Sequence, residues 1–342
     1  MIIGGSEASD SRYPYAAYLM YDNSPFCGGS LIASDVVLSA GHCLTMTEGV
    51  QPYTVVIGRH NVTHTDEGEE FTNAWGIPHP DYNLYKGDDN DFGLIFLPNR
   101  TQQDTIVRLN KDDDVPIDGQ MLTYFGWGVT DQNSTDPPVS DVPLEIERAT
   151  ISNEKCSAID GVYMGHNETY NGYITDNMIC TFAFDKDSCQ RDSGGPEIVK
   201  GSNATTDLQV GVISWGLGCA TNIFPGVSAR ISKAYEWIRT EVCNRSAEPP
   251  SDFECQTFNE ANAYNNSDPT TTFPNAIPTL SSSPSANKND VDEEESPSPS
   301  PNSNENAAEV STAAKSGTSS CIATAIDGKI QVMVMLLLWF GL

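Results

Sequence analysis

Short β-type segments, separated by glycine, proline and other turn residues, follow one another through the first 245 residues of the chain. Many short strands with this punctuation are typical of an all-β barrel or sandwich. One helix is also predicted, because Ser232 is a suitable N-cap and the apolar residues Tyr235, Ile238 and Val242 recur at helical spacing. The predicted strands are residues 36–40, 53–58, 92–97, 121–127, 210–215 and 226–230.

The composition changes after residue 245. Residues 246–320 are rich in Pro, Ser, Thr and Asn, and residues 290–295 are nearly all acidic, a composition too polar to bury a core. A chain of 342 residues is long enough for two domains, but one β-barrel protein can fill roughly 200 to 250 residues. We therefore predict one folded domain at 2–245 and a disordered stalk at 246–320.

The last segment, residues 321–342, ends in an apolar tail. The tail, residues 330–342, is shorter than the roughly 20 residues that a membrane-spanning helix needs. Small residues, a spacer and a short apolar tail together match the signal for a glycosylphosphatidylinositol (GPI) anchor. We predict that processing removes this segment with Cys321; a short transmembrane tail and an incidental apolar end are the alternatives. The small residues of the candidate attachment site are Ser316, Gly317, Ser319 and Ser320.

The formal net charge of the chain is −29, and the acidic excess is not confined to the predicted stalk. An acidic protein repels phosphate backbones, so nucleic acid is not an expected partner. It attracts basic polypeptides, although salt screening limits this effect to the encounter rate. Solubility is the simpler explanation of the charge.

Nine cysteines and several Asn-x-Ser/Thr sequons indicate a chain that folds and is glycosylated in an oxidising compartment. No basic and apolar signal peptide stands before the segment Ile2-Ile3-Gly4-Gly5. We therefore expect a signal peptide and a propeptide upstream of the given chain, and an extracellular protein that is tethered to the cell surface. The candidate glycosylation sites are Asn61, Asn99, Asn133, Asn167, Asn203, Asn244 and Asn265.

The stretch from Asp187 to Pro196 is suited to carry a nucleophile. Ser193 is followed by two glycines and a proline, so the backbone can turn sharply and a substrate can approach without meeting a Cβ. A serine hydroxyl needs a general base and a third group that orients the base. His42, in Leu-Ser-Ala-Gly-His-Cys, and Asp91, in Asn-Asp-Phe-Gly, provide these groups in the chain order His, Asp, Ser.

With these three motifs and the N-terminal segment Ile2-Ile3-Gly4-Gly5, the chain resembles the trypsin/chymotrypsin family of serine proteases from residue 2 to about residue 242. The resemblance implies two six-stranded antiparallel β-barrels, a C-terminal helix and an active site between the barrels. It also implies that His42 takes the proton of Ser193 and that Asp91 orients His42. The backbone N–H groups of Arg191 and Ser193 would form the oxyanion hole.

The resemblance also implies a specificity pocket and an activation step. It places Asp187 at the base of the pocket, where a carboxylate selects Arg or Lys before the cleaved bond. Activation would free the amino group of Ile2 to pair with Asp192, so the chain with Met1 in place is expected to be zymogen-like. The residues expected to line the pocket are Asp187, Ser188, Ser214, Trp215, Gly216, Gly218 and Gly226.

Disulfide pairing is taken from the resemblance, since spacing alone does not fix it. The resemblance implies the bridges Cys27–Cys43, Cys156–Cys180 and Cys189–Cys219. Cys243 and Cys255 could pair locally, which leaves Cys321 unmatched.

The chain departs from the family pattern at two positions that bear on function. Arg191 replaces a glycine, and its Cβ could disfavour the backbone conformation of the oxyanion hole, at a cost of about 1 to 3 kcal/mol. Arg59 stands where the first carboxylate ligand of a calcium-binding loop belongs. We therefore predict no calcium site, and no other metal or cofactor.

The leading hypothesis is a secreted or cell-surface serine endopeptidase that cleaves proteins and peptides after Arg or Lys and that protein inhibitors can block. The rival hypothesis is a catalytically silent homologue that binds a partner protein or acts as an inhibitor module, motivated by Arg191 and by the missing activation region. A third hypothesis is a surface glycoprotein whose stalk matters more than its folded domain. The complete set of His42, Asp91 and Ser193 favours the enzyme.

Overall fold

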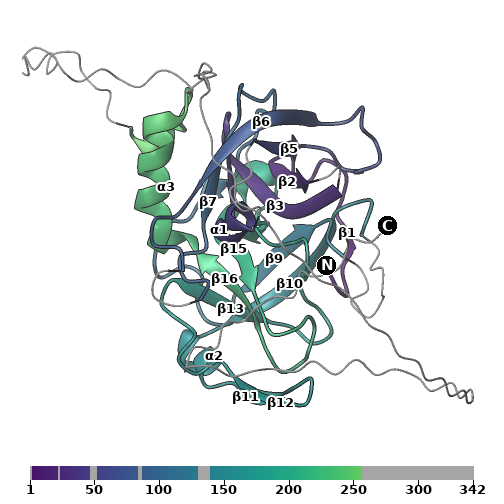
Figure 1. The fold of residues 1–342 in the computed structure, drawn as a ribbon, viewed down its shortest axis with the longest axis vertical. Coiled ribbons are helices and arrows are strands. Elements are labelled where there is room, and N and C mark those ends of the chain that lie inside the picture. The colour runs from purple at the N-terminus through teal and green to yellow at the C-terminus, as the bar shows by residue number, and fades with distance from the viewer. Residues whose placement is uncertain (1, 22–23, 47–51, 84–86, 130–138, 256–342) are drawn as a thin grey trace, which may run out of the picture. The chain divides into compact units, whose positions relative to one another are not determined.

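The structure is a computed structural model that describes residues 2–21, 24–46, 52–83, 87–129 and 139–255. The described part of the chain contains two β-barrels, and a long helix follows them in the chain (Figure 1). The predicted all-β fold with two six-stranded antiparallel barrels and a C-terminal helix is confirmed.

The first barrel is a closed ring of antiparallel strands in the order β2-β3-β4-β7-β6-β5. Its interior is apolar, and Leu31, Leu38, Val55 and Ile95 are fully buried in it. Three of the predicted strands form β4, β5 and β7. The bounds are β2 (Ala16–Tyr21), β3 (Ser24–Ala33), β4 (Val36–Ser39), β5 (Tyr53–Ile57), β6 (Glu69–Pro78) and β7 (Gly93–Phe96).

The second barrel closes because β10 pairs with both β9 and β13, giving the ring β9-β10-β13-β16-β15-β14. Its strands bury charged and polar side chains, among them Tyr124, Arg148 and Glu197. The short strands β1 and β8 pair with β10 and β15. The bounds are β1 (Ser6–Glu7), β8 (Arg108–Leu109), β9 (Met121–Gly126), β10 (Leu144–Ile151), β13 (Met178–Phe182), β14 (Pro196–Val199), β15 (Leu208–Trp215) and β16 (Gly226–Arg230).

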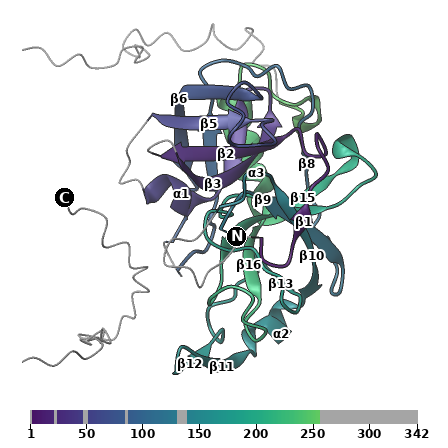
Figure 2. The same ribbon diagram turned by 90° about the vertical axis from the view of Figure 1, so that its right-hand side faces the viewer.

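A hairpin extends the second barrel at the end away from the first barrel (Figure 2). Its strands β11 (Asp160–Tyr163) and β12 (His166–Thr169) pair antiparallel and follow the short helix α2 (Asn153–Ser157). Both strands lie within the loop that the Cys156–Cys180 bridge closes, and the helix carries Cys156. A single 3₁₀ turn, η1 (Ala204–Thr206), connects β14 to β15.

The C-terminal helix α3 (Ile231–Arg245) packs as the sequence predicts, with Tyr235, Ile238 and Val242 buried. The prediction that Ser232 is the N-cap is wrong, because the helix begins at Ile231 and Ser232 lies inside its first turn. The chain passes directly from β16 into α3, and Ile231 is already fully buried at the junction. Burial of this side chain, rather than a polar cap, fixes where the helix starts.

The packed domain extends beyond residue 245. Residues 246–255, predicted as the first part of a disordered stalk, turn back onto the first barrel instead. The backbone N–H of Ala247 donates to Asp35 Oδ2 at 2.8 Å, and Phe253, in η2 (Ser251–Phe253), is buried against Tyr235. A disulfide between Cys243 and Cys255 closes the turn. The polar composition of the segment gave no sign of this packing, because its order depends on one buried aromatic residue, Phe253, and on the Cys243–Cys255 bridge.

The three disulfides taken from the family resemblance are confirmed, as is the local pairing of Cys243 with Cys255. Among the described residues, no helix is long and apolar enough to cross a membrane. The rest of the predicted stalk, the candidate anchor site at Ser316, Gly317, Ser319 and Ser320, and the residues Cys321, Asn133 and Asn265 lie outside the described residues.

Candidate active site

His42 and Asp91 are brought together by the pairing of two strands in the first barrel. β4 leads into the short helix α1 (Gly41–Thr45), which carries His42, and Asp91 stands two residues before β7. β4 and β7 are neighbours in the barrel, with Ser39 opposite Gly93. The helix also needs a glycine at 41, because a Cβ there would lie 2.9 Å from the carbonyl oxygen of Phe92.

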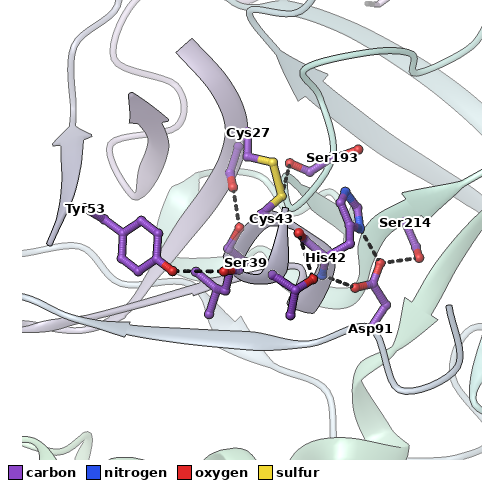
Figure 3. The surroundings of a disulfide bond; sticks show 11 residues. Cys27, Ser39, His42, Cys43, Tyr53, Asp91, Ser193 and Ser214 are labelled. Carbon is purple, nitrogen blue, oxygen red and sulfur yellow. Dashed lines mark hydrogen bonds and ion pairs between the residues drawn. A yellow bond between two sulfur atoms is a disulfide. The ribbon is translucent and has the colours of Figure 1, made fainter. Parts of the chain in front are cut away.

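Asp91 is fully buried and accepts three hydrogen bonds (Figure 3). Its Oδ2 lies 2.7 Å from His42 Nδ1 and accepts the Ser214 hydroxyl at 2.5 Å. Its Oδ1 accepts the backbone N–H of His42 at 2.8 Å. Since Nδ1 of His42 donates to the carboxylate, Nε2 is the ring nitrogen that can accept a proton.

The pair shifts the pKa values of both side chains. Burial alone would lower the pKa of His42, but the charge and hydrogen bond of Asp91 outweigh it, and the pKa of His42 is raised. Burial would raise the pKa of Asp91, but the His42 charge and the hydrogen bonds from His42 and Ser214 leave it lowered. Asp91 therefore stays ionised near neutral pH and favours a proton on the imidazole.

Ser193 lies on the side of the His42 ring opposite Asp91, next to the Cys27–Cys43 bridge (Figure 3). Its carbonyl oxygen accepts the N–H of Gly28 at 2.7 Å, which ties the serine loop to β3 of the first barrel. In the described part of the chain, no hydrogen bond joins the Ser193 hydroxyl to His42. Such bonds are often long before substrate binds and tighten in the complex.

The loop around Ser193 leaves two backbone donors open. The N–H of Gly195 donates to the carbonyl of Asp192 at 2.9 Å, which bends the chain around Ser193. The N–H groups of Arg191 and Ser193 have no hydrogen-bond acceptor among the residues that the structure describes. Arg191 has φ of +74°, a left-handed conformation that suits the glycine it replaces.

Two of the expected pocket residues, Asp187 and Gly226, lie against a guanidinium that sequence reasoning missed. Arg148 Nη1 donates to Asp187 Oδ1, and both side chains are nearly fully buried. A Cβ on Gly226 would lie 2.5 Å from Arg148 Nη2, and a Cβ on Gly216 would lie 3.7 Å from the Gly226 Cα. Of the other expected pocket residues, Ser188 and Trp215 are half-buried, and Gly218 has a φ of +71°.

A signal for Arg148 was present in the sequence. Buried residues alternate along β10, with Ile146, Arg148 and Thr150 facing the interior of the second barrel. An arginine at an inward position of a barrel strand needs a buried acceptor. The pattern therefore calls for a carboxylate inside this barrel, although it does not say which one.

The residues expected to take part in activation, Ile2 and Asp192, are both buried. Ile2 is 2% exposed, and Ile3 forms an isolated β-bridge with Asp187, with the N–H of Ile3 donating to the Asp187 carbonyl at 2.7 Å. The buried carboxylate of Asp192 accepts the N–H of Cys189 at 3.1 Å and the N–H of Gly128 at 3.0 Å. Met1 lies outside the described residues.

Arg59 fills the loop where the family resemblance would place calcium. The Arg59 side chain is buried, and its Nε donates to the carbonyl of Glu67 at 2.8 Å. Its Nη2 donates to the carbonyl of Thr65 at 3.4 Å. The guanidinium thus uses carbonyl oxygens that could ligate a hard cation, so these residues do not fit a calcium ion.

One group of described residues has the spacing of a metal site, namely Cys27, His42 and Cys43. The two cysteines are joined in a disulfide and therefore offer no thiolate. His42 in turn holds Asp91 through Nδ1. This group is better explained by the disulfide and the His–Asp pair than by a metal.

The described candidate glycosylation sites are on the surface. Asn99, Asn167, Asn203 and Asn244 are exposed, and Asn61 is half-buried. The Asn61 side chain accepts the N–H of Thr63 at 2.9 Å. Exposure is compatible with glycosylation, which stays a prediction.

The structure has two antiparallel barrels, and buried hydrogen bonds of Asp91 with Ser214 and His42 join them. A second serine, Ser193, lies beside the imidazole of His42 and is followed by two glycines. These features define the class of two-barrel serine proteases. A family profile described as Trypsin matches residues 2–238. The chain belongs to the trypsin family, whose members are serine protease hydrolases.

Known proteins similar to this chain agree with that assignment. "Serine protease 1" of Homo sapiens is 34% identical over 249 residues, a match that covers 72% of this chain and 91% of that protein. "Vitellin-degrading protease" of Bombyx mori is 30% identical over 249 residues, covering 71% and 86%. The solved structure titled "Neuropsin, a serine protease expressed in the limbic system of mouse brain" matches with a TM-score of 0.58 at 29% identity, covering 70% of this chain and 99% of that chain.

The backbone conformation of Arg191 leads to a test by substitution. A non-glycine residue in the left-handed region costs about 1 to 2 kcal/mol, and a β-branched residue tolerates it least. We expect Arg191→Gly to keep or raise kcat, and Arg191→Val to lower kcat by about tenfold or more. Steady-state kinetics on peptide substrates measures both.

Ser24→Ala is the matched control, because it removes only the weak contact from Arg191 Nη1 to the Ser24 hydroxyl, at 3.4 Å. A loss of kcat in Arg191→Gly as large as that in Arg191→Val would show that the side chain, not the backbone conformation, is what matters.

Proposed function

We propose that the chain is a serine endopeptidase that acts through an acyl-enzyme, with Ser193 as nucleophile, His42 as general base and Asp91 as the group that orients the base. The observation that carries this proposal is the hydrogen bond between His42 Nδ1 and the buried Asp91 carboxylate. It fixes the tautomer in which Nε2 faces Ser193 without a hydrogen of its own.

The reaction follows from these positions. Nε2 of His42 accepts the hydroxyl proton as Ser193 Oγ attacks the peptide carbonyl carbon, and Asp91 stabilises the imidazolium that forms. The oxyanion accepts hydrogen bonds from the N–H groups of Arg191 and Ser193. His42 then protonates the leaving amine, which departs from the acyl-enzyme. Water, deprotonated by His42, hydrolyses the ester and restores Ser193.

The predicted cleavage after Arg or Lys depends on the carboxylate of Asp187. Its burial next to a guanidinium that fits against Gly226 supports a pocket with charged groups at its base. That guanidinium, however, belongs to Arg148 of the same chain. The preference therefore depends on whether Arg148 or a substrate cation holds Asp187.

The rival, a catalytically silent homologue, rests on Arg191. Its left-handed φ shows that the loop keeps the conformation a glycine would allow, despite the Cβ. The intact Asp91 network gives no reason for loss of chemistry. We therefore favour the enzyme.

Secretion, glycosylation, a zymogen stage, the GPI anchor and recognition by protein inhibitors remain predictions. Four disulfides among the described residues support folding in an oxidising compartment. Trypsin-family proteases act on proteins or peptides, and we propose the same substrate class here.

Covalent labelling tests the nucleophile. A fluorophosphonate probe is expected to label the chain at Ser193, as peptide mass spectrometry can show. Ser193→Ala should abolish labelling and lower kcat by about a millionfold. Ser188→Ala is the control for a neighbouring hydroxyl in the same loop and should still label. A folded chain that begins at Ile2, with a free amino group there, and does not react with the probe would support the silent homologue instead.

The raised pKa of His42 sets the pH dependence. The protonated imidazole cannot act as the base, so kcat/KM should rise with pH through a midpoint above about 6.5, the ordinary value for histidine. Asp91→Asn removes the charge that raises this pKa, so the midpoint should move to lower pH while kcat falls about 10,000-fold.

Ser214→Ala is the control for this profile, because it removes one hydrogen bond to Asp91 and keeps the charge. Its midpoint should stay closer to that of the unmodified protein. The assignment of His42 as the base would be contradicted by an Asp91→Asn profile with an unchanged midpoint.

Activation is tested with two forms of the chain, one that retains Met1 and one that begins at Ile2. If the amino group of Ile2 pairs with Asp192, the second form should turn over about 100-fold faster, comparable to the gain of one oxyanion donor. Asp192→Asn should remove the difference. Pairing would raise the pKa of the amino group above its ordinary value of about 8, so the advantage should fade as pH rises beyond that. Equal turnover of the two forms would refute this activation step.

A further inference from the structure

Arg148 lies inside the second barrel with its guanidinium fixed from several sides. The side chain is 2% exposed, and its Nη1 donates to Asp187 Oδ1. Its Nη2 donates to the carbonyl of Thr181, and its Cζ lies 5.1 Å from the centre of the Tyr124 ring. These contacts come from β9 and β13, so the guanidinium is held by the barrel wall as well as by Asp187.

The guanidinium occupies the space in front of Gly226. A Cβ on this glycine would lie 2.5 Å from Arg148 Nη2 and 2.6 Å from Nη1, which is closer than atoms can pack. Gly216 lies opposite, since its Cβ would be 3.7 Å from the Gly226 Cα. The room that these glycines leave for a long substrate side chain is therefore shortened by a side chain of the protein.

The carboxylate of Asp187 is already satisfied. Its Oδ1 accepts from Arg148, and its Oδ2 accepts the backbone N–H of Ala220 at 2.8 Å. The Asp187 side chain is 7% exposed. A substrate guanidinium binds a carboxylate best through two parallel hydrogen bonds, and both oxygens of Asp187 already accept a hydrogen bond from the protein.

A third charged group lies behind the pair. Glu197 on β14 is fully buried and accepts the Tyr124 hydroxyl. Its burial raises its pKa to about 7, although the Tyr124 hydrogen bond and the Arg148 charge oppose the shift. The cluster of Asp187, Arg148 and Glu197 thus carries little net charge, and none of its members presents a free positive group to an acidic substrate.

We propose that Arg148 is a specificity-determining residue, an inference that rests on the proposed function as an endopeptidase. Because Arg148 holds Asp187, the pocket prefers an uncharged side chain before the cleaved bond to that of Arg or Lys. A substrate cation at the base would stand beside the guanidinium of Arg148, and like charges in a buried site repel. Arg148 cannot withdraw easily, since Thr181 and Tyr124 hold it as well.

A peptide panel tests the proposal on the unmodified enzyme. Five peptides differ only in the residue before the scissile bond, which is Arg, Lys, Leu, Gln or Glu. We expect kcat/KM for Leu or Gln to exceed that for Arg, Lys and Glu by about tenfold or more. A higher kcat/KM for Arg or Lys, or for Glu, overturns the proposal.

Substitution of Arg148 tests the cause. Arg148→Met keeps much of the side-chain volume and frees Asp187, so the ratio of kcat/KM for Arg over Leu should rise about 100-fold. In Arg148→Met/Asp187→Ser, which removes both charges, this gain should vanish. Arg12→Met is the matched control: it breaks another arginine–aspartate pair, with Asp207 at 2.6 Å, and should leave the ratio unchanged. An unchanged ratio in Arg148→Met overturns the proposal.

A measurement of inhibitor binding tests the role of Arg148 independently of the proposed function as an enzyme. Benzamidine presents a planar cation like that of arginine, and its affinity is measured by calorimetry on Ser193→Ala variants, which need no catalysis. We expect weak binding when Arg148 is present and about tenfold tighter binding in Arg148→Met. Equal affinity overturns the role of Arg148, whereas failure of Ser193 to label with a fluorophosphonate overturns the enzyme function alone. If Arg148→Met does not fold, the panel on the unmodified enzyme remains decisive.

Discussion

The buried carboxylate of Asp91 is the constraint on which the site depends. A carboxylate without exposure to water is costly unless hydrogen bonds and an opposite charge compensate it. His42 from the first barrel and Ser214 from the second barrel supply that compensation. One ionised group therefore fixes the imidazole and also links the two barrels at the point where Ser193 lies. Loss of His42 would leave the carboxylate without its charge partner, and loss of Ser214 would remove one of its three hydrogen bonds.

In the proposed enzyme, the first barrel orients the catalytic residues and the second barrel contributes to substrate recognition. The first barrel has an apolar interior and holds His42 and Asp91 at the ends of paired strands. The second barrel buries Arg148 with Asp187 and keeps Glu197 close behind them. Burying charges inside a barrel costs free energy, so we attribute the polar interior of the second barrel to the proposed recognition of substrate rather than to stability.

Local signals in the sequence indicated the β-rich fold and the candidate catalytic residues, whereas the two barrels and three disulfides followed from the family resemblance that these signals revealed. Turn residues mark the ends of strands, and the motifs around His42, Asp91 and Ser193 are short and lie in a fixed order. Arg148 could not be assigned in this way, since its partner Asp187 is 39 positions away and the contact depends on the register of β10 in the closed barrel. Residues 246–255 escaped prediction for a related reason: their order comes from Asp35, Tyr235 and a bridge, all outside the segment's own composition.

The most direct test of the account is a crystal structure of the chain after reaction with a peptide aldehyde that carries leucine before the reactive carbon. The account predicts a bond from Ser193 Oγ to that carbon, with the adduct oxygen about 3 Å from the N–H groups of Arg191 and Ser193. The hydrogen bonds from His42 to Asp91 and from Arg148 to Asp187 should be retained. A peptide bound without that bond, with Ser193 turned away from His42, would contradict it.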